Sequence, residues 1–175
     1  LQKLPPCFVE GEEVLGKLQG LFDVYLASSL HFLNTNLQTM LPTIDNNLAA
    51  SLLRLMDCYL ERFYVKEGRE DPSESEINTF KASIEGLFVF SLIWSVGCVA
   101  NEKSRLMFDT YLREKMNEEG ASSLFPNQES VFDYYFEVQQ KKWIKWSALI
   151  PDIEIDLRLS YSELIVPTVE STRTS

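Results

Sequence analysis

Phosphate binding is the first chemistry that the glycines and lysines of this 175-residue chain could support. A P-loop needs glycines for a tight backbone cradle, a Lys for the phosphates and a Ser or Thr hydroxyl for Mg²⁺. Gly16 is the only glycine followed directly by Lys, and the next residue, Leu18, carries no hydroxyl. The chain therefore has no P-loop sequence, and we expect Gly16 and Lys17 to lie on the surface of a helix.

The chain has few candidate residues for acid–base, nucleophilic or metal chemistry. His31 is the only histidine, so a His-based relay or a His-rich metal site would rest on one residue. Adjacent carboxylates occur at Glu12-Glu13 and Glu118-Glu119, and such pairs can do acid–base work when burial separates their pKa values. They stand at a helix start and in a loop, where solvated faces are expected. We predict no catalytic residue and no metal site, and a carboxylate-based hydrolase would lack a positioned nucleophile.

An aromatic cluster in the last third of the chain has two interpretations, stacking on single-stranded nucleic acid or packing across a hairpin. The chain has 16 Lys and Arg against 26 Asp and Glu, a net charge of −10, and a pI near 4.6. This charge repels phosphate backbones and anionic lipid headgroups, so we predict hairpin packing and neither a nucleic-acid nor a membrane partner. The cluster consists of Phe132, Tyr134, Tyr135, Phe136, Trp143 and Trp146.

Length and composition predict one ordinary core. The chain is 45% hydrophobic and 24% charged, which suits a single domain and is too apolar for a disordered chain. The longest stretch without an ionisable residue in the apolar middle, residues 86–101, is shorter than the roughly 20 residues of a bilayer crossing. The chain begins without Met or a signal region, and we expect both ends to be cuts through a longer protein.

The three cysteines are Cys7, Cys58 and Cys98. An odd number at such wide spacing is unlike a disulfide framework or a zinc site. We therefore expect these residues to be reduced, buried and intracellular.

The first two helices follow from apolar residues repeating at steps of three, four or seven. One covers residues 12–36. The other follows the break at Pro42, takes Thr43 or Asp45 as its N-terminal cap, and runs to about residue 65.

Two further helices follow. The third begins near Ser75 and is apolar on nearly all sides over residues 86–97, which is typical of a buried central helix. The fourth is capped by Asn101 and continues to the break at Gly120.

The pattern then changes to strands. Residues 131–138 are rich in aromatic and β-branched side chains, and residues 143–146 alternate large with smaller or polar ones, which predicts a β-hairpin with its turn at 139–142. Residues 153–159 alternate strictly between apolar and charged, which predicts a half-buried strand. A short apolar run then ends at Pro167.

A series of short motifs runs through the second half of the chain. They are Ile93-Trp-Ser-Val-Gly97, Arg105 to Arg113, Phe125-Pro126, Val131-Phe-Asp-Tyr134, Trp143 with Trp146, and Ile165-Val-Pro-Thr168 followed by Thr172-Arg173. In this order and spacing they resemble the dynein heavy chain motor, of the axonemal rather than the cytoplasmic type. The chain departs from the family near its end, where Ser171 replaces the usual Thr, so Arg173 is given no role.

This resemblance implies a mainly α fold, a helical bundle of the AAA+ small or lid type with four or more helices, followed by a small C-terminal β-hairpin and strand segment. Residues 1–120 would be the lid of the second AAA+ module, and residues 121–175 the hairpin and the N-terminal segment leading into the third. The turn formed by Ile165, Val166, Pro167 and Thr168 would lie over the adenine of the third module, where an apolar wall suits a purine. From the residues alone, the same turn is a strand end.

The resemblance also implies a function, that of a coupling element in an ATP-driven microtubule motor, without a complete ATPase site and inactive in isolation. ATP or ADP and Mg would bind elsewhere in the parent protein. Its partners would be neighbouring AAA+ modules of the same chain and, through the parent, microtubules and dynein light and intermediate chains. The location would be the cytoplasmic cytoskeleton and the axoneme of a cilium or flagellum.

From the residues alone, an alternative is a free-standing acidic helical adaptor that docks a partner through its aromatic hairpin. If instead ring neighbours cover part of this chain, the hairpin should expose more apolar surface than a monomer tolerates. We expect that exposure at Trp143, Trp146 or residues 131–138.

Overall fold

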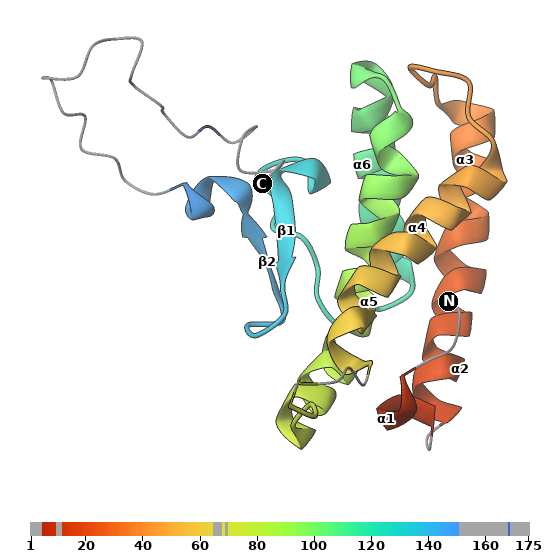
Figure 1. Cartoon of the computed structure of the whole chain (residues 1–175). Coiled ribbons are helices and arrows are strands. Elements are labelled where there is room, and N and C mark those ends of the chain that lie inside the picture. The colour runs from red at the N-terminus through yellow and green to blue at the C-terminus, as the bar shows by residue number, and fades with distance from the viewer. Residues whose placement is uncertain (1–4, 10–11, 65–67, 69, 151–167, 169–175) are drawn as a thin grey trace, which may run out of the picture.

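The computed structural model of the chain describes residues 5–9, 12–64, 68, 70–150 and 168. Long helices stand side by side as a bundle, and a two-stranded hairpin lies against one side of it (Figure 1). The prediction of a mainly α bundle with a small hairpin is confirmed. The helices are α1 (Pro6–Val9), α2 (Glu12–Leu21), α3 (Ala27–Asn36), α4 (Asp45–Leu60), α5 (Glu74–Ser95) and α6 (Glu102–Glu118), and the strands are β1 (Tyr134–Glu137) and β2 (Lys142–Lys145).

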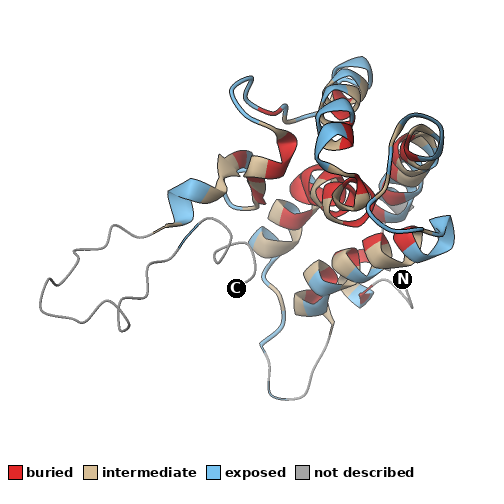
Figure 2. Ribbon diagram, turned by 90° about the horizontal axis from the view of Figure 1, so that it is seen from above, coloured by how far each residue is buried: buried red, intermediate tan, exposed pale blue. Residues whose placement is uncertain are grey.

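Helix α5 forms the centre of the bundle, as its all-round apolar sequence predicts. It contacts α4, α2 and β1, and Ile84, Leu92 and Ile93 on it are fully buried. Seen from above, buried residues gather on the sides where the helices face one another (Figure 2).

By length and composition alone, residues Glu74–Val99 could span a membrane. However, 67% of the most apolar 18-residue stretch of this segment is buried within the protein. A helix surrounded by other elements must be apolar on every side. The composition of α5 therefore follows from its central place in the fold.

The first predicted helix, residues 12–36, is helical throughout but changes its turn in the middle. Between α2 and α3, the segment Phe22–Leu26 forms a π-helix. An α-helix has about 3.6 residues per turn, and a π turn accommodates one residue more. The buried positions along this rod step by four, three, four, four and four, so the wider turn keeps the later ones facing the core. They are Val14, Leu18, Leu21, Tyr25, Ser29 and Leu33.

The Ser28 hydroxyl follows the π turn and donates to the carbonyl of Val24 at 2.6 Å and to that of Tyr25 at 3.2 Å. These bonds give hydrogen-bond partners to carbonyls within the widened turn. The apolar spacing predicted the rod but not the π turn, because spacing alone does not reveal how each hydrogen bond closes.

Deleting the exposed Asp23 tests the origin of the π turn. The shortened segment should close as an α-helix without rotating either flank, so the free energy of unfolding should change by less than about 1 kcal/mol. The matched control deletes exposed Arg54 from the regular helix α4, which rotates Met56 and Leu60 off the core and should cost more than about 4 kcal/mol. Urea unfolding followed by circular dichroism measures both. Equal losses in the two variants would contradict this account.

Helix α5 begins with a capping box that the sequence analysis missed by placing the start near Ser75. The Ser73 hydroxyl accepts from the Glu76 backbone N–H at 3.2 Å, and the Glu76 carboxylate accepts from the Ser73 N–H at 2.8 Å. The pKa of the Glu76 carboxyl lies below its ordinary value, mainly because it accepts a hydrogen bond from the Ser73 backbone N–H and, second, one from the Ser73 hydroxyl. The Ser-x-x-Glu pattern is the sequence signal for this start.

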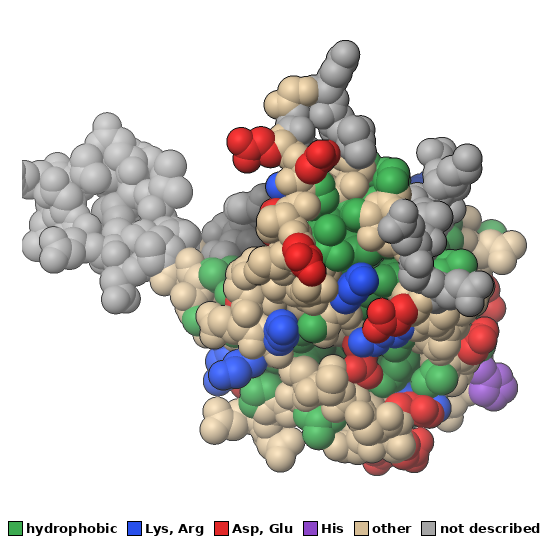
Figure 3. All heavy atoms as spheres, turned by 90° about the horizontal axis from the view of Figure 1, so that it is seen from below, with side chains coloured by type: hydrophobic (Ala, Val, Ile, Leu, Met, Phe, Trp, Pro, Cys, Tyr) green, Lys and Arg blue, Asp and Glu red, His purple; other side chains and the backbone are tan. Residues whose placement is uncertain are grey.

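An exposed ion pair connects the segment after α4 to the first turn of α5. Arg62 reaches Glu76 at 3.1 Å and so joins the end of α4 to the start of α5. Seen from below, side chains of both charge signs stand among hydrophobic ones (Figure 3). This face carries mixed charge rather than the basic patch that a phosphate backbone would require.

The two other predicted caps have different outcomes. Asn101 caps α6 as predicted, with its side-chain oxygen accepting from the Ser104 N–H at 3.0 Å. The cap predicted for α4 is wrong, because Ile44 occupies that position without a side-chain cap. Asp45 instead lies in the first turn, where a carboxylate is favourable, and accepts from the Asn34 amide at 3.0 Å. Helix α4 ends at Leu60 and continues only as the 3-10 turn η2 (Glu61–Phe63).

The predicted hairpin is present but shorter than expected. Its register pairs Tyr134 with Lys145 and Phe136 with Trp143 in antiparallel strands. The segment Val131–Asp133, predicted as strand, is the 3-10 turn η4, and a further 3-10 turn, η5 (Trp146–Leu149), follows β2. The strand predicted at residues 153–159 and the apolar run before Pro167 lie outside the described residues.

The cysteine prediction is wrong in one respect. All three thiols are free, but Cys58 is exposed on α4, whereas Cys7 and Cys98 are half-buried. Cys58 lies on the side of α4 away from the core residues Met56 and Leu60. Burial raises the pKa of the Cys7 and Cys98 thiols.

Thiol labelling should separate these residues. Because the thiolate is the reactive form, Cys58 should react with a disulfide reagent well before Cys7 and Cys98 at pH 7.5. The rates of Cys7 and Cys98 should rise further as the pH increases above 9. Mass spectrometry of timed samples measures the order, and Cys58→Ser should remove the fast phase. A fast phase that survives this substitution would contradict the exposure seen here.

Candidate functional site

The hairpin meets the bundle where α5 carries no side chain. A Cβ added at Gly86 would lie 2.2 Å from Cε2 of Phe136, closer than any real contact. Glycine in the middle of a helix is destabilising by roughly 0.5–1 kcal/mol relative to Ala, but here it lets the ring of β1 rest on the helix backbone. The Ser83 hydroxyl, one turn earlier, also donates to the Val138 carbonyl of the hairpin at 3.3 Å.

Further along α5, aromatic rings from three segments interlock. Trp94 lies edge to face with Phe132, with 6.3 Å between ring centres, and with Trp146, at 6.5 Å. Trp146 also contacts Phe90 of α5 and Tyr135 of β1. Edge-to-face pairs of this kind stabilise packing beyond the area they bury. We use the name aromatic seam for two groups of contacts together. One is the group of five rings, Phe90, Trp94, Phe132, Tyr135 and Trp146, and the other is the contact of Phe136 with Gly86.

A second group of rings fastens the loop after α6 to the hairpin. Phe125 stacks on Trp143 with 4.0 Å between ring centres, and the Trp143 indole N–H donates to the Ser123 carbonyl at 3.1 Å. Trp143 also lies edge to face with Phe136. The ring that faces Gly86 is thus held from its other side.

Arg105 of α6 links the end of α5 to the aromatic seam. Its guanidinium donates to the carbonyls of Cys98 at 3.0 Å and Ala100 at 3.2 Å, which lie in and just after the 3-10 turn η3 (Gly97–Val99). It also lies 5.3 Å from the centre of the Phe132 ring, a cation–π contact. A single side chain therefore connects α6, the end of α5 and the start of the hairpin.

Comparison with known protein families identifies the family of this chain. The model of the dynein heavy chain AAA lid domain family matches residues 18–148. The chain belongs to this family. The matched range includes the hairpin as well as the bundle, so the aromatic seam lies wholly within it.

The lid is similar to several heavy chains of known name. It is 31% identical to dynein axonemal heavy chain 1 of Homo sapiens and 29% identical to that of Mus musculus, in alignments that cover 100% of this chain and 4% of each relative. It is 28% identical to the dynein beta chain, ciliary, of Heliocidaris crassispina over 87% of this chain and 3% of that protein. The lid thus spans only a few per cent of the length of these relatives. The comparisons give no support to a free-standing adaptor.

The expectation of an exposed hairpin is wrong. Only 6% of Trp143 and 8% of Phe136 is exposed, Val131 and Tyr134 are buried, and Trp146 is half-buried. Their apolar faces are covered by α5 and by the loop before the hairpin. The large exposed apolar side chains include Met40, Leu41 and Ile44 in the loop between α3 and α4, and Leu106 on α6.

The adenine-side turn predicted from the resemblance lies mostly outside the described residues. Ile165, Val166 and Pro167 are not described, and Thr168 is exposed and outside regular secondary structure. The prediction for these four residues therefore stays untested.

The remaining residues considered for chemistry lie on the surface. Gly16 and Lys17 are exposed on α2 as predicted, and His31 is exposed on α3. Glu119 is also exposed and pairs with Lys115 at 2.7 Å. Within the described part of the chain, no three His, Cys, Asp or Glu side chains gather closely enough to hold a metal ion.

Gly86 and Arg105 are contact residues that the sequence alone did not identify. A glycine inside an apolar helical stretch signals a close approach by another element. Arginines and an aspartate at positions 105, 109 and 113 share one helix face, which signals a common partner. Both signals are visible in the sequence, but neither names the partner.

Substituting Gly86 measures how closely the aromatic seam is packed. Gly86→Ala should lower the free energy of unfolding by about 1–3 kcal/mol because the Phe136 ring must move. The control Gly16→Ala has nothing within 4 Å of the new methyl group and should raise stability by up to about 1 kcal/mol. Chemical denaturation measures both. If Gly86→Ala were also stabilising, the close contact would be wrong.

Proposed function

We propose that this chain works within a dynein heavy chain motor as a coupling element between two successive AAA+ modules of the ring. Membership of the AAA lid family supports the motor context. The aromatic seam supports the coupling role, because it places bundle and hairpin residues in one hydrophobic core. Close-packed cores deform little, so elements that share one move as a rigid body.

We further assign residues 1–120 to the lid of the second module and residues 121–175 to the hairpin and the segment leading into the third. The division follows from the resemblance to the dynein motor, and the lid family model extends past it, over residues 18–148. The helical part also ends near Gly120, whose φ of 65° suits the end of a helix. In this assignment, the turn from Ile165 to Thr168 faces the adenine of the third module.

The wider setting follows from the names of the relatives. Axonemal and ciliary heavy chains suggest that the parent protein works on microtubules in the axoneme of a cilium or flagellum. There it would act with its own neighbouring AAA+ modules and with dynein light and intermediate chains. ATP or ADP and Mg would bind at P-loops elsewhere in the parent, since this chain has no P-loop sequence.

The mechanism is a transfer of rotation. When a lid tilts with the nucleotide state of its module, the hairpin packed on α5 tilts with it. Each aromatic pair in the seam adds about 0.5–1.5 kcal/mol beyond area burial, so several pairs together oppose separation of hairpin and lid. The start of the next module then follows the lid of the previous one.

The test loosens the aromatic seam in the intact heavy chain. Trp146→Ala removes the ring that contacts Trp94, Phe90 and Tyr135, and microtubule-stimulated ATPase should fall several-fold because the modules no longer move together. His31→Ala, on a helix across the bundle from the hairpin (Figure 1), should leave it unchanged. Hydrogen exchange on the same samples verifies that the hairpin is looser. Full ATPase activity with a loosened hairpin would overturn the coupling role.

A further inference from the structure

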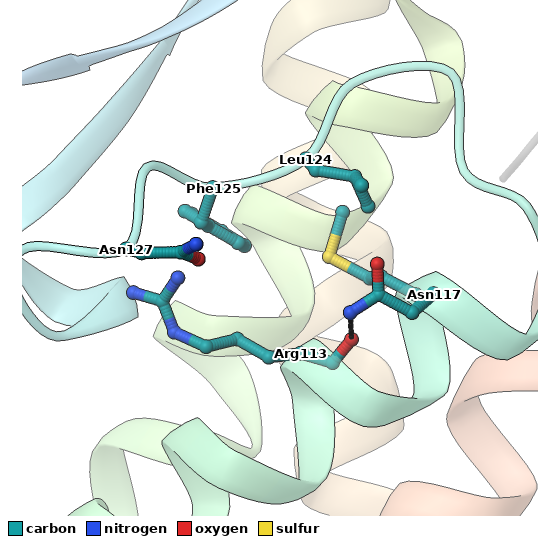
Figure 4. Close-up of a pocket in the computed structure, with 6 residues that line it drawn as sticks. Arg113, Asn117, Leu124, Phe125 and Asn127 are labelled. Carbon is teal, nitrogen blue, oxygen red and sulfur yellow. Dashed lines mark hydrogen bonds between the residues drawn. The ribbon is translucent and has the colours of Figure 1, made fainter.

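Two side chains of α6, Arg113 and Asp109, tie the loop that leads into the hairpin to this helix. The Arg113 guanidinium donates to the Pro126 carbonyl at 2.9 Å and to the Glu129 carbonyl. Its Nε lies 3.3 Å from the Asp109 carboxylate one turn earlier, and its charged group lies 5.4 Å from the centre of the Phe125 ring. Figure 4 shows Arg113 reaching from α6 toward Phe125 and Asn127 of this loop.

Asp109 completes the attachment from the other end of the loop. Its carboxylate accepts from the Val131 backbone N–H at 2.6 Å while it holds Arg113. The network then continues into the hairpin, because the Glu129 carboxylate pairs with Lys145 of β2 at 2.7 Å. Glu129 therefore links α6 to β2, because its main-chain carbonyl accepts from Arg113 and its carboxylate pairs with Lys145.

Two hollows border Arg113, so part of the contact between the loop and α6 is open. On one side, a cavity of about 230 Å³ is lined by Arg113, Met116, Asn117, Leu124, Phe125 and Asn127 (Figure 4). On the other, a shallow hollow of about 430 Å³ is lined by Leu106, Asp109, Arg113 and residues 127–130. The directional hydrogen bonds of Asp109 and Arg113 cross from α6 to the loop beside these hollows, while Phe125 of the same loop packs on Trp143.

The two attachments of the hairpin differ in kind. The aromatic seam is apolar contact, which is not directional and fixes how close the hairpin lies to α5. Hydrogen bonds have preferred angles, and those of Arg113 to two main-chain carbonyls fix the path of the loop. The Asp109 and Arg113 side chains are each only 19% exposed, so water screens the pair less than it would an open surface pair.

We propose that Asp109 and Arg113 form a latch that sets the orientation of the hairpin relative to α6. With the latch closed, a movement of α6 is transmitted to β1 and β2 in a defined direction. With the latch open, the hairpin stays attached through the aromatic seam but changes its angle. A role of this orientation in the motor rests on the proposed coupling function. The latch itself depends only on contacts within this chain.

Hydrogen exchange of the isolated chain tests the latch. Arg113→Met should speed exchange at the Val131 amide and its loop neighbours by roughly tenfold, as expected for local opening, and should leave the amides of α5 unchanged. Arg113→Lys should give a smaller effect, because an ammonium group lacks the planar fork that reaches several acceptors together. The matched control is Lys115→Gln, which removes the Lys115–Glu119 pair of the same helix without touching the loop.

A distance measurement tests the orientation directly. In a Cys58→Ser background, cysteine-linked spin labels at the exposed residues Glu114 and Gln140 should give one narrow distance distribution, which Arg113→Met should broaden and Lys115→Gln should not. Unchanged exchange and an unchanged distribution would overturn the latch, as would faster exchange spread equally over α5. None of these measurements depends on motor activity. The latch could therefore be disproved while the Trp146→Ala experiment still tests the coupling function.

Discussion

The close approach of Phe136 to the backbone of α5 at Gly86 is the contact on which the rest of this structure depends. Because the ring rests directly on the helix, the hairpin comes close enough for Trp94 to meet Phe132 and Trp146. A side chain at position 86 would push the hairpin outward and open these contacts together. The missing methyl group at position 86 therefore sets how closely the hairpin packs on the bundle.

The bundle and the hairpin are joined by two kinds of contact with different physics. The aromatic seam buries large rings and resists separation, whereas the polar face of α6 directs hydrogen bonds to the carbonyls and amides of the loop. Arg105 covers Phe132 in the region of the aromatic seam and also binds the Cys98 and Ala100 carbonyls between α5 and α6. Of the motifs that carry the family resemblance, those between residues 93 and 146 lie at or beside these contacts, which gives their order in the sequence a structural meaning.

Local signals predicted the helices well because periodic spacing and caps act over a few residues. The cap at Asn101 is an example. Contacts between distant residues were not predictable, because a single sequence does not name partners. The Asp109 bond to Val131 spans 22 residues, and the π turn depends on which carbonyl each amide finds. The adenine-side turn, predicted only from the resemblance, lies outside the residues that the structure describes.

The central place of α5 also has a consequence for how the protein is made. Synthesis proceeds from the N-terminus, so α2 to α4 are available to cover one side of α5 as it leaves the ribosome. The opposite side waits for the hairpin, and 55 residues separate Ser83 from its hairpin partner Val138. During that interval the nascent chain presents a long apolar helix face to solvent, and exposed apolar surface of this kind is prone to aggregation. The order of elements along the chain therefore creates a stage of translation at which folding of this lid is most vulnerable.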